Sequence, residues 1–402
     1  MCDNCISGRG PHLAGDLTRR DILARMAAGG ALLAAGGLLP GVAAAQDAAA
    51  IGVGPYEATG LARLAVDQPF QRQVFERRAL QPDDVLIDIL YCGICHTDIH
   101  AANNDFGFTN WPLMPGHEIV GRVAAVGPAV TRFKVGDAAG VGCMVNSCGE
   151  CEFCLAGTEQ YCARGNTQTY GLHRPTGENL LGGFSNRIVV REAFTLRIPD
   201  GMDLARTAPL LCAGVTTFSP LEHWQVGAGD RVGVVGLGGL GHVAVKLAVA
   251  RGAEVTVMTT SEAKRADALA MGAADVMVWP DPEGVGARFG SFDSILSTVP
   301  VAFDPNPFLM MLRTDGKLIN VGLFTPFSEQ PNNILLMVGR KSVVGSLIGS
   351  LAETQAVLDY CGKNNILADI EMVRADEVEA AKTRVKAKDV RYRFVIDMST
   401  LA

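Results

Sequence analysis

The chain has 402 residues, of which 48% are hydrophobic and 19% are charged. This length suggests two domains, and this composition excludes both a disordered chain and a bundle of membrane spans. A net charge of −7 and a pI near 5.6, without a dense Lys/Arg cluster, argue against a nucleic-acid-binding surface, so no nucleic-acid partner is expected.

Residues 1–45 differ from the rest of the sequence. Arg19-Arg20 precedes an uncharged stretch rich in Ala, Gly and Leu, and Ala43-Ala44-Ala45 offers the small residues of a cleavage site. This segment resembles a twin-arginine signal peptide and predicts a periplasmic protein that is exported folded. The alternative is an unstructured or anchored tail, because the stretch is just long enough to span a bilayer although it is only weakly apolar. A cytoplasmic location follows if the signal interpretation is wrong.

Residues 55–200 read as short strands separated by Gly and Pro turns, for example 84–90 and 121–127. They predict a β-rich, barrel-like domain. No stable membrane span is expected once the signal is cleaved.

A tight cysteine run lies inside this domain. Cys148, Cys151, Cys154 and Cys162 follow the pattern C-x2-C-x2-C-x7-C, and four thiolates so close together can surround a tetrahedral zinc ion completely. Such a closed site holds a lobe in shape and leaves no position for chemistry. Two disulfides are the alternative for four neighbouring cysteines.

A second set is scattered along the chain and comprises Cys95, His117 and Cys212. Two thiolates and one imidazole leave the fourth position of a zinc ion open for water or a substrate oxygen, which is the arrangement of catalytic zinc. The remaining cysteines lack ligand spacing: Cys92, Cys143 and Cys361 are expected to be core thiols, and Cys2 and Cys5 receive no role.

Residues 201–346 alternate buried strands with helices, which predicts a doubly wound α/β domain. A strand at 232–235 runs into Gly236-Leu237-Gly238-Gly239-Leu240-Gly241, a helix opens at about His242, and a second strand follows at 254–258. In this context the glycine loop brings backbone N–H groups and a helix N-terminus to a pyrophosphate. The sequence therefore predicts a dinucleotide site.

The end of the second strand distinguishes two cofactors. NAD enzymes usually place an acidic residue there for the ribose hydroxyls. Here Thr259-Thr260-Ser261 is followed by Lys264 and Arg265, and hydroxyls plus cations suit the 2′-phosphate of NADP. Glu262 opposes this interpretation, since it would repel the phosphate if it pointed inward. NADP(H) is favoured over NAD(H).

The tail, residues 347–402, contains a predicted helix at 352–364 and a strand at 391–396 and is expected to return to the first domain. The predicted organisation is a signal peptide at 1–45, a catalytic domain at 55–200 and 347–402, and a nucleotide-binding domain at 201–346.

Several motifs in this order resemble one family, the zinc-dependent medium-chain alcohol dehydrogenases, and within it the cinnamyl-alcohol-dehydrogenase branch. The resemblance extends from about Pro55 to the C-terminus and implies a GroES-like β-rich catalytic domain joined to a Rossmann domain. The motifs are Gly93-Ile94-Cys95-His96-Thr97-Asp98, Gly116-His117-Glu118, Cys212-Ala213-Gly214-Val215-Thr216, the cysteine run, the glycine loop and Asp389-Val390-Arg391-Tyr392-Arg393-Phe394.

The resemblance also implies roles for single residues. It makes Cys95, His117 and Cys212 ligands of the catalytic zinc, with Glu118 as a second-layer carboxylate or an alternate ligand. It makes Thr97 and His100 a proton relay through the cofactor ribose, and it assigns Thr216 to the cofactor site.

Other positions that match the family receive no catalytic role. His96 is expected to face the cofactor pyrophosphate, whereas Asp98 and Asp105 are left out as solvated or capping residues. The resemblance places three apolar residues near the substrate pocket, with core packing as the alternative: Trp111, Phe324 and Leu347.

Together these features predict two zinc ions per chain and NADP-dependent interconversion of primary alcohols and aldehydes, with broad specificity that includes aromatic aldehydes because the expected pocket is apolar. The alternatives are a polyol or other medium-chain dehydrogenase and an exported protein that binds zinc and nucleotide without turnover. The complete set of ligand and relay residues argues against the last. A homodimer is implied by the resemblance, and how an exported enzyme would obtain NADP(H) stays open.

Overall fold

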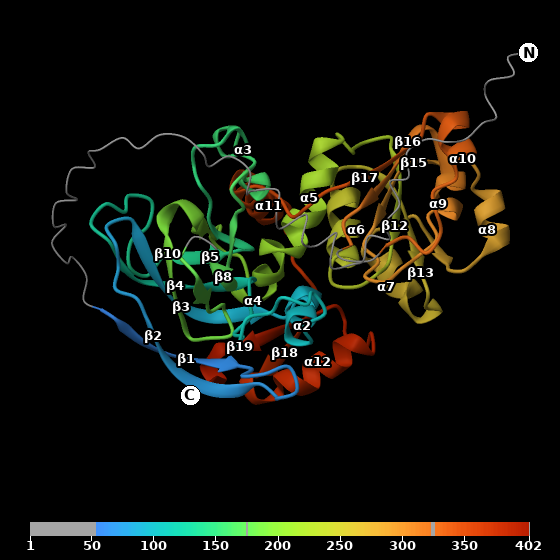
Figure 1. The fold of residues 1–402 in the computed structure, drawn as a ribbon. Helices are drawn as coiled ribbons and strands as arrows, with labels where there is room; N and C mark the ends of the chain where they lie inside the picture. Colours follow the sequence, from blue (N-terminus) through green and yellow to red (C-terminus); the bar gives the residue numbers. More distant parts are fainter. Residues whose placement is uncertain (1–53, 174–175, 323–325, 402) are drawn as a thin grey trace, which may run out of the picture.

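The computed structural model describes residues 54–173, 176–322 and 326–401. These form two lobes that lie side by side, with the C-terminal segment returning beneath the first lobe (Figure 1). The predicted signal peptide lies outside the described residues.

The first lobe is built on a seven-stranded sheet in the order β11-β5-β4-β3-β19-β18, with β10 also paired to β3. Its central strand β3 (Asp84–Gly93) pairs antiparallel with β4 (Ile119–Val126) and with β19 (Arg393–Asp397), and β18 (Ile370–Arg374) runs parallel to β19. The predicted strands at 84–90, 121–127 and 391–396 are confirmed. Because β18 and β19 join this sheet, the chain's last segment contributes to the same lobe as its first.

The remaining strands of this lobe are short. They are β1 (Tyr56–Ala62), β2 (Gln71–Arg77), β5 (Ala138–Val141), β6 (Met144–Asn146), β7 (Thr167–Gln168), β8 (Gly171–His173), β9 (Glu178–Leu180), β10 (Arg187–Arg191) and β11 (Leu196–Arg197). Its helices are α2 (His96–Ala102), α3 (Glu152–Leu155), α4 (Leu204–Thr207), α11 (Leu351–Asn364) and α12 (Val378–Lys386), with 3-10 turns η1 (Glu159–Tyr161), η2 (Glu192–Phe194), η3 (Ala208–Leu211), η5 (Ala375–Glu377) and η6 (Met398–Leu401).

The second lobe contains a six-stranded sheet in the order β14-β13-β12-β15-β16-β17, and every pair in it is parallel. Strand β12 (Arg231–Val235) lies at the point where the strand order reverses, between β13 (Glu254–Thr259) and β15 (Phe292–Ser297). Ligands of open parallel sheets bind at the carboxyl ends of the strands beside such a reversal. The glycine loop follows β12 directly, so it occupies this position.

The other elements of this lobe are the remaining strands of the sheet and the helices that lie against it. They are α5 (Ala213–His223), α6 (Gly241–Ala250), η4 (Glu262–Lys264), α7 (Arg265–Ala270), β14 (Asp275–Val278), α8 (Pro282–Ala287), α9 (Asn306–Met311), β16 (Leu312–Asn320), α10 (Asn333–Gly339) and β17 (Ser342–Gly345). The helix predicted after the glycine loop and the helix predicted at 352–364 are confirmed by α6 and α11.

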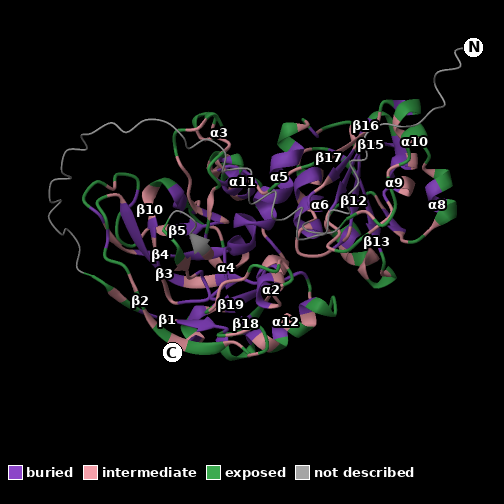
Figure 2. Cartoon of the chain, in the orientation of Figure 1, coloured by how far each residue is buried: buried purple, intermediate pink, exposed green. Residues whose placement is uncertain are grey.

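Burial follows the predicted pattern. The strands of the parallel sheet carry near-continuous apolar runs, and Val232, Val234, Val255 and Val257 are fully buried, as expected for a sheet that is covered on both faces. Figure 2 shows the same contrast between buried strands and the exposed outer sides of α8 and α10. The predicted fold class, a β-rich domain joined to a doubly wound α/β domain, is confirmed.

Helix α5 connects the two lobes, because it begins immediately after Cys212 and packs against both α6 and α11. Within the described part of the chain, no helix combines the length and the apolar character needed to cross a membrane.

Candidate active site

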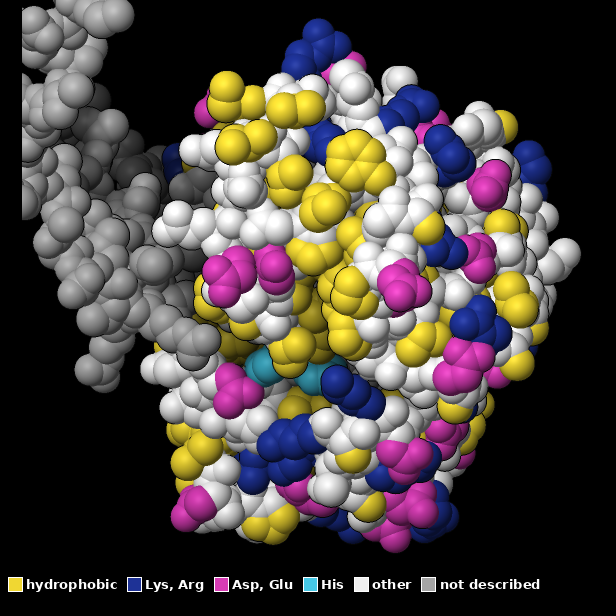
Figure 3. Space-filling model, turned by 90° about the vertical axis from the view of Figure 1, so that its right-hand side faces the viewer, with side chains coloured by type: hydrophobic (Ala, Val, Ile, Leu, Met, Phe, Trp, Pro, Cys, Tyr) yellow, Lys and Arg dark blue, Asp and Glu magenta, His cyan; other side chains and the backbone are white. Residues whose placement is uncertain are grey.

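A cleft of about 1610 Å³ lies between the lobes. Residues of α2 and the C-terminal segment line one side, and the glycine loop and the ends of β13 and β15 line the other. In the space-filling view of Figure 3 this hollow has histidine side chains at its floor and Lys or Arg side chains beside them. The cleft therefore brings metal-ligating residues, cations and the predicted nucleotide loop into one cavity.

The scattered ligand set converges on the floor of the cleft. Cys95 lies at the N-terminal cap of α2, His117 precedes β4, and Cys212 caps α5; their ligand atoms and a carboxylate oxygen of Glu118 all lie within 4.8 Å of one another. The sulfurs of Cys95 and Cys212 are 3.9 Å apart, and Nε2 of His117 is 3.3 Å from the sulfur of Cys212. Two thiolates that share a tetrahedral zinc at about 2.3 Å lie about 3.8 Å apart. The three side chains thus fit one zinc ion.

Asp98 orients this set and was missed by the sequence analysis. Its side chain is buried and accepts hydrogen bonds from Nδ1 of His117 at 3.1 Å, from the N–H of Cys95 at 2.8 Å and from the N–H of Gly116 at 3.0 Å. Burial alone would lower the pKa of His117, but the Asp98 carboxylate and nearby thiols raise that pKa well above its ordinary value. Asp98 does cap α2, as considered, but it is not solvated. A carboxylate behind a histidine ligand fixes its ring and tautomer.

Glu118 and Arg393 form a buried pair behind the ligands. Both carboxylate oxygens of Glu118 lack a hydrogen-bond partner, and burial raises the pKa of Glu118 to about 8. Nη2 of Arg393 lies 3.3 Å from Glu118 Oε1, while Nη1 donates to the carbonyl of Ile94 at 3.1 Å. A buried carboxylate with free lone pairs beside three soft ligands suits the second-layer or alternate-ligand role.

Arg393 also reaches the glycine loop, since a Cβ on Gly239 would lie only 2.8 Å from the guanidinium carbon. It therefore connects the metal ligands with the nucleotide side of the cleft. In the sequence, Arg393 was identified only as part of a family motif. Its signal was a charged residue at the start of β19, whose next three residues are apolar.

The predicted relay residues lie one turn apart on α2, and both line the cleft. The hydroxyl of Thr97 is 3.7 Å from the sulfur of Cys95, and Nδ1 of His100 is 2.8 Å from Asp105. No hydrogen bond joins Thr97 to His100 among the described residues, so a relay between them needs a bridging group. Asp105 is exposed, as expected, and it holds the His100 ring. His96 lines the cleft beside His100, with ring centres 5.3 Å apart.

The wall next to the ligands is apolar. Phe106, Leu113, Tyr170 and Leu347 line the cleft. Trp111 packs against this group without being among the residues that line the cleft, and Phe324 lies outside the described residues. Of the three apolar residues named from the sequence, the structure brings Leu347 to the cleft itself.

Cys143 differs from the other two thiols that were expected in the core. Cys92 and Cys361 are fully buried, whereas Cys143 is half-buried, lines the cleft and lies beside Cys212. Cys143 still packs against the core cluster of the first lobe, as expected, but it also lines the cleft, which the sequence did not predict.

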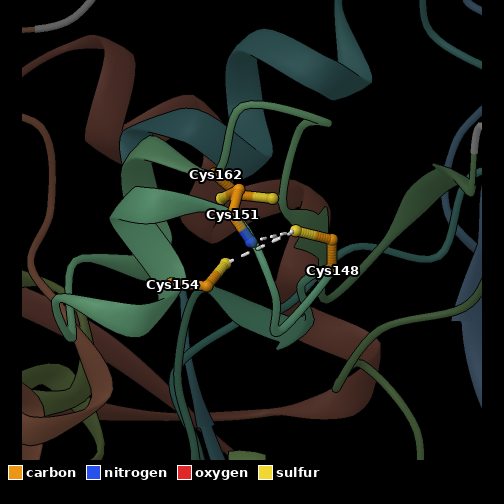
Figure 4. Close-up of side chains that lie close together, drawn as sticks. All are labelled: Cys148, Cys151, Cys154 and Cys162. Atoms are coloured by element: carbon orange, nitrogen blue, oxygen red, sulfur yellow. Dashed lines mark hydrogen bonds between the residues drawn. The ribbon is translucent and has the colours of Figure 1, made fainter.

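The four clustered cysteines converge at a separate place on the first lobe (Figure 4). Their sulfurs lie within 4.8 Å of one another, with 3.8 Å between Cys148 and Cys154. The N–H groups of Cys151 and Ala163 point at the sulfurs of Cys148 and Cys151, each at 3.4 Å, which favours thiolates. All nine described cysteines are free, and a disulfide would need about 2.05 Å between sulfurs. The geometry matches a zinc ion and not two disulfides.

The glycine loop provides a cradle that side chains would fill. Gly236 has a φ of 91°, and a Cβ on Gly241 would lie 1.9 Å from the carbonyl oxygen of Gly236. Residues 236–240 line the cleft and so does Thr216, which is nine-tenths buried on α5. Gly241 is absent from the lining, so its role is close packing of helix against loop.

The far end of the cleft, beyond β13, is lined by Thr259, Thr260 and Lys264 but not by Ser261. Nζ of Lys264 donates to the carbonyl of Leu237 at 2.7 Å and has no carboxylate partner among the described residues. Glu262, the one feature that opposed NADP, is exposed and pairs with Arg265 at 2.5 Å. Its charge is therefore neutralised by Arg265, which leaves Lys264 as the cation of this strand end.

Comparisons with known proteins agree with this geometry. Residues 81–200 match the model of the alcohol dehydrogenase GroES-like domain, and residues 239–363 match that of the zinc-binding dehydrogenase domain.

Individual relatives are similar over most of their length. The chain is 49% identical over 333 residues to a probable formaldehyde dehydrogenase AdhA of Bacillus subtilis, covering 83% of this chain and 95% of the relative. It is 47% identical to NADP-dependent alcohol dehydrogenase C 1 of Mycolicibacterium smegmatis, covering 85% and 97%. Among solved structures, cinnamyl alcohol dehydrogenase SbCAD4 of Sorghum bicolor has a TM-score of 0.82 at 41% identity, covering 86% of this chain and 98% of that one.

Proposed function

The chain belongs to the zinc-type medium-chain alcohol dehydrogenase family, and from that premise we propose that it interconverts primary alcohols and aldehydes by hydride transfer with NADP(H). One observation carries this function: an open set of zinc ligands and a glycine-loop cradle face each other across a single cleft. Neither feature alone requires an oxidoreductase. Together they would hold a zinc ion and a nicotinamide cofactor in the same cleft, where the zinc would supply Lewis-acid polarisation and the cofactor the hydride.

Each residue at the floor of the cleft has its own role in the reaction. Cys95, His117 and Cys212 would hold the catalytic zinc, and Asp98 keeps the imidazole in the ligating orientation. When bound, zinc supplies Lewis-acid polarisation of the substrate oxygen and NADP(H) supplies or accepts the hydride. Glu118, buried beside the ligands, serves as a second-layer carboxylate or as an alternate ligand.

Proton transfer is assigned to α2. The hydroxyl of Thr97 holds or releases the proton at the substrate oxygen, and His100 exchanges protons with solvent. Their placement on one face of α2, with His100 held by Asp105 at 2.8 Å, supports this division. His96, beside them, is assigned to the pyrophosphate side.

A second zinc per chain is assigned to Cys148, Cys151, Cys154 and Cys162. The convergence of four sulfurs without a disulfide supports a closed structural site.

The preference for NADP(H) is assigned to the end of β13. Thr260 and Lys264 line the cleft there, and the charge of Glu262 is neutralised by Arg265. The relative in Mycolicibacterium smegmatis, whose name describes it as NADP-dependent, supports the same choice.

Substrates are assigned to a broad class of aldehydes that includes aromatic ones. The apolar wall formed by Phe106, Leu113, Tyr170 and Leu347 supports this, because it offers aromatic and aliphatic surface with few polar groups. A polyol would require hydrogen-bonding groups along this wall.

Two properties concern the whole protein. Export to the periplasm by the twin-arginine route is supported by Arg19-Arg20 and the stretch that follows, and Arg19-Arg20→Lys-Lys should leave the precursor in the cytoplasm if it is right. Homodimerisation is supported by the exposed apolar side chains Ile334, Met337 and Val338 on α10, which are 68%, 78% and 80% exposed. Met337→Asp should then convert a dimer to a monomer in light scattering.

The function is tested with initial rates of the mature, zinc-loaded protein on a panel of aldehydes and alcohols, each with NADP(H) and NAD(H) in parallel. We expect aldehyde reduction with NADPH to exceed that with NADH at least tenfold, with two zinc ions per chain by elemental analysis. Equal rates with both cofactors would refute the cofactor assignment. No turnover on any substrate despite two bound zinc ions would favour the binding-protein alternative.

A further inference from the structure

Lys388 lies in the turn between α12 and β19 and lines the same end of the cleft as Thr260 and Lys264. It comes from the C-terminal segment of the first lobe, whereas Lys264 comes from the second. Among the described residues its ammonium group has neither a hydrogen-bond acceptor nor a carboxylate partner. Its role was not assigned from the sequence.

The backbone of Lys388 is unusual for a lysine. Its φ is 60°, in the left-handed region where a Cβ costs about 1 to 2 kcal/mol and where glycine or asparagine is the ordinary choice. A lysine in this conformation costs folding free energy, so its charged side chain should provide a compensating interaction elsewhere. Lys388 is exposed and lines the cleft, so its ammonium group is available to a ligand bound at this end.

This end of the cleft carries more cationic side chains than free carboxylates. Arg391 pairs with Asp267 at 2.6 Å, and Asp389 pairs with Arg384 at 3.0 Å, so the nearby carboxylates are engaged. In the part of the chain that the structure describes, neither Lys264 nor Lys388 has an ion-pair partner. Burial lowers the pKa of Lys264, the positive charges of Arg391 and Lys388 lower it further, and the Asp267 carboxylate opposes them.

We propose that Lys388 is a second cationic ligand of the 2′-phosphate of NADP(H), facing Lys264 across the cleft. This inference rests on the proposed use of NADP(H) and adds a residue from the opposite lobe. The phosphate would neutralise two cations that otherwise repel each other, and it would tie the C-terminal segment to the end of β13. NAD(H) has a hydroxyl at this position and gains nothing from either lysine.

The test is Lys388→Asn, because asparagine tolerates the left-handed conformation and removes only the charge. We expect the Kd for NADPH and for the fragment 2′,5′-ADP to rise about 10-fold or more, the loss of one charge-assisted hydrogen bond. The Kd values for NADH and 5′-AMP should stay within about twofold. The unfolding temperature of the ligand-free protein should stay equal or rise, since the backbone is relieved.

Two further variants make the result specific. Lys388→Arg keeps the charge and should retain most of the affinity for 2′,5′-ADP. Lys386→Asn removes a lysine two residues earlier, whose Nζ bonds Asn103 at 3.1 Å and which is absent from the cleft lining, and it should leave all four Kd values unchanged.

Equal weakening of NADPH and NADH by Lys388→Asn, or no weakening of either, would overturn the proposal while leaving the proposed function intact. If the unaltered protein binds NADH but neither NADPH nor 2′,5′-ADP, the assignment of NADP(H) itself fails. Calorimetric titration separates these results without any turnover.

Discussion

The two candidate zinc sites of this chain are assembled in opposite ways. Cys148, Cys151, Cys154 and Cys162 come from one short loop on the first lobe and lie partly exposed, with only Cys162 buried. The ligands at the cleft floor, by contrast, come from three elements separated by up to 117 residues and are all buried. The first set can form wherever its loop closes. The second exists only once β3, β4 and α5 are in place.

This difference in assembly accompanies a difference in chemistry. The loop offers four thiols, none of them among the residues that line the cleft, so a bound ion would be saturated and would contribute only folding free energy. The floor offers two thiols and an imidazole beside an open cleft, with Asp98 and Glu118 behind them. The comparison predicts that damage to one site acts mainly on stability and damage to the other mainly on turnover.

The largest expected effect is on stability. Cys151→Ser should lose the closed-site zinc, and structural zinc contributes about 10 kcal/mol or more of folding free energy in zinc-finger peptides. We expect the unfolding midpoint to fall by roughly 20 °C or more, since each kcal/mol lost shifts it by about 2 to 4 °C in a large domain. Glu152→Gln, an exposed neighbour on α3, is the control and should leave the midpoint unchanged. An unchanged midpoint in Cys151→Ser would contradict a closed structural site.

The second effect is on turnover. Cys212→Ser should lower kcat/KM by about 1000-fold, because Lewis-acid stabilisation is worth several kcal/mol and each 1.4 kcal/mol is a factor of ten. Zinc content should fall from two ions to one, while the unfolding midpoint changes by a few degrees at most. Full activity with a serine at this position would eliminate the zinc assignment at the cleft floor. A midpoint loss as large as that of Cys151→Ser would erase the distinction between the two sites.

A smaller effect is expected one layer behind the ligands. Asp98→Asn keeps the shape of the side chain but weakens its hold on His117, and such replacements typically cost about 10- to 100-fold in metal affinity or activity. Zinc titration against a chelator, together with kcat/KM at saturating zinc, would measure both. Since the hydrogen bonds of Asp98 go to Cys95, Gly116 and His117, the zinc assigned to the clustered cysteines should be retained. Loss of both ions together would show that Asp98 supports the whole lobe instead of one ligand.

The features that the sequence predicted most clearly are those that depend on residue spacing within a short stretch of the chain. The cysteine run, the glycine loop after a strand and the helix that follows are short patterns, and each appears in the structure where its pattern placed it. The resemblance extended this to residues far apart in the chain. It joined Cys95, His117 and Cys212 into one set, which spacing alone could only suggest.

The residues that were missed act through tertiary contacts. Asp98 looks like an ordinary capping residue in the sequence, and only the fold shows that it is buried against His117. Arg393 begins β19, a strand whose next three residues are apolar, and its contacts with Glu118 and Gly239 arise only because β19 returns beside β3. Ser261 was expected in the cofactor site but is not among the cleft-lining residues, because the chain turns into η4 just after it. Such effects have no period or spacing from which to infer them.

His242 lies at the contact between the lobes. The cleft-floor site depends on this contact, whereas the cysteine loop does not. This residue is fully buried at the start of α6 and stacks on Tyr392 of the C-terminal segment. Its Nδ1 bonds the carbonyl of Gly238 at 3.0 Å, and its Nε2 accepts from the N–H of Asp369 at 3.1 Å, which requires a neutral ring. Burial lowers the pKa of His242 to about 3, with Lys246 and Arg393 lowering it and Gly238 and Asp369 opposing them.

The smallest predicted effect follows from this neutral histidine. Because its folded pKa lies below the unfolded value of about 6.5, the folded state binds fewer protons than the unfolded state between these values, and stability falls as the pH falls. Between pH 7 and pH 5 this group should remove about 1 to 2 kcal/mol. Urea unfolding of the unaltered protein and of His242→Gln at both pH values isolates the contribution, since the other titrating groups cancel in the difference. His242→Gln should therefore lose less stability between pH 7 and pH 5 than the unaltered protein. An equal pH dependence in the two proteins would contradict this. It would mean that the ring is protonated within the fold and that the contact between the lobes does not depend on its neutrality.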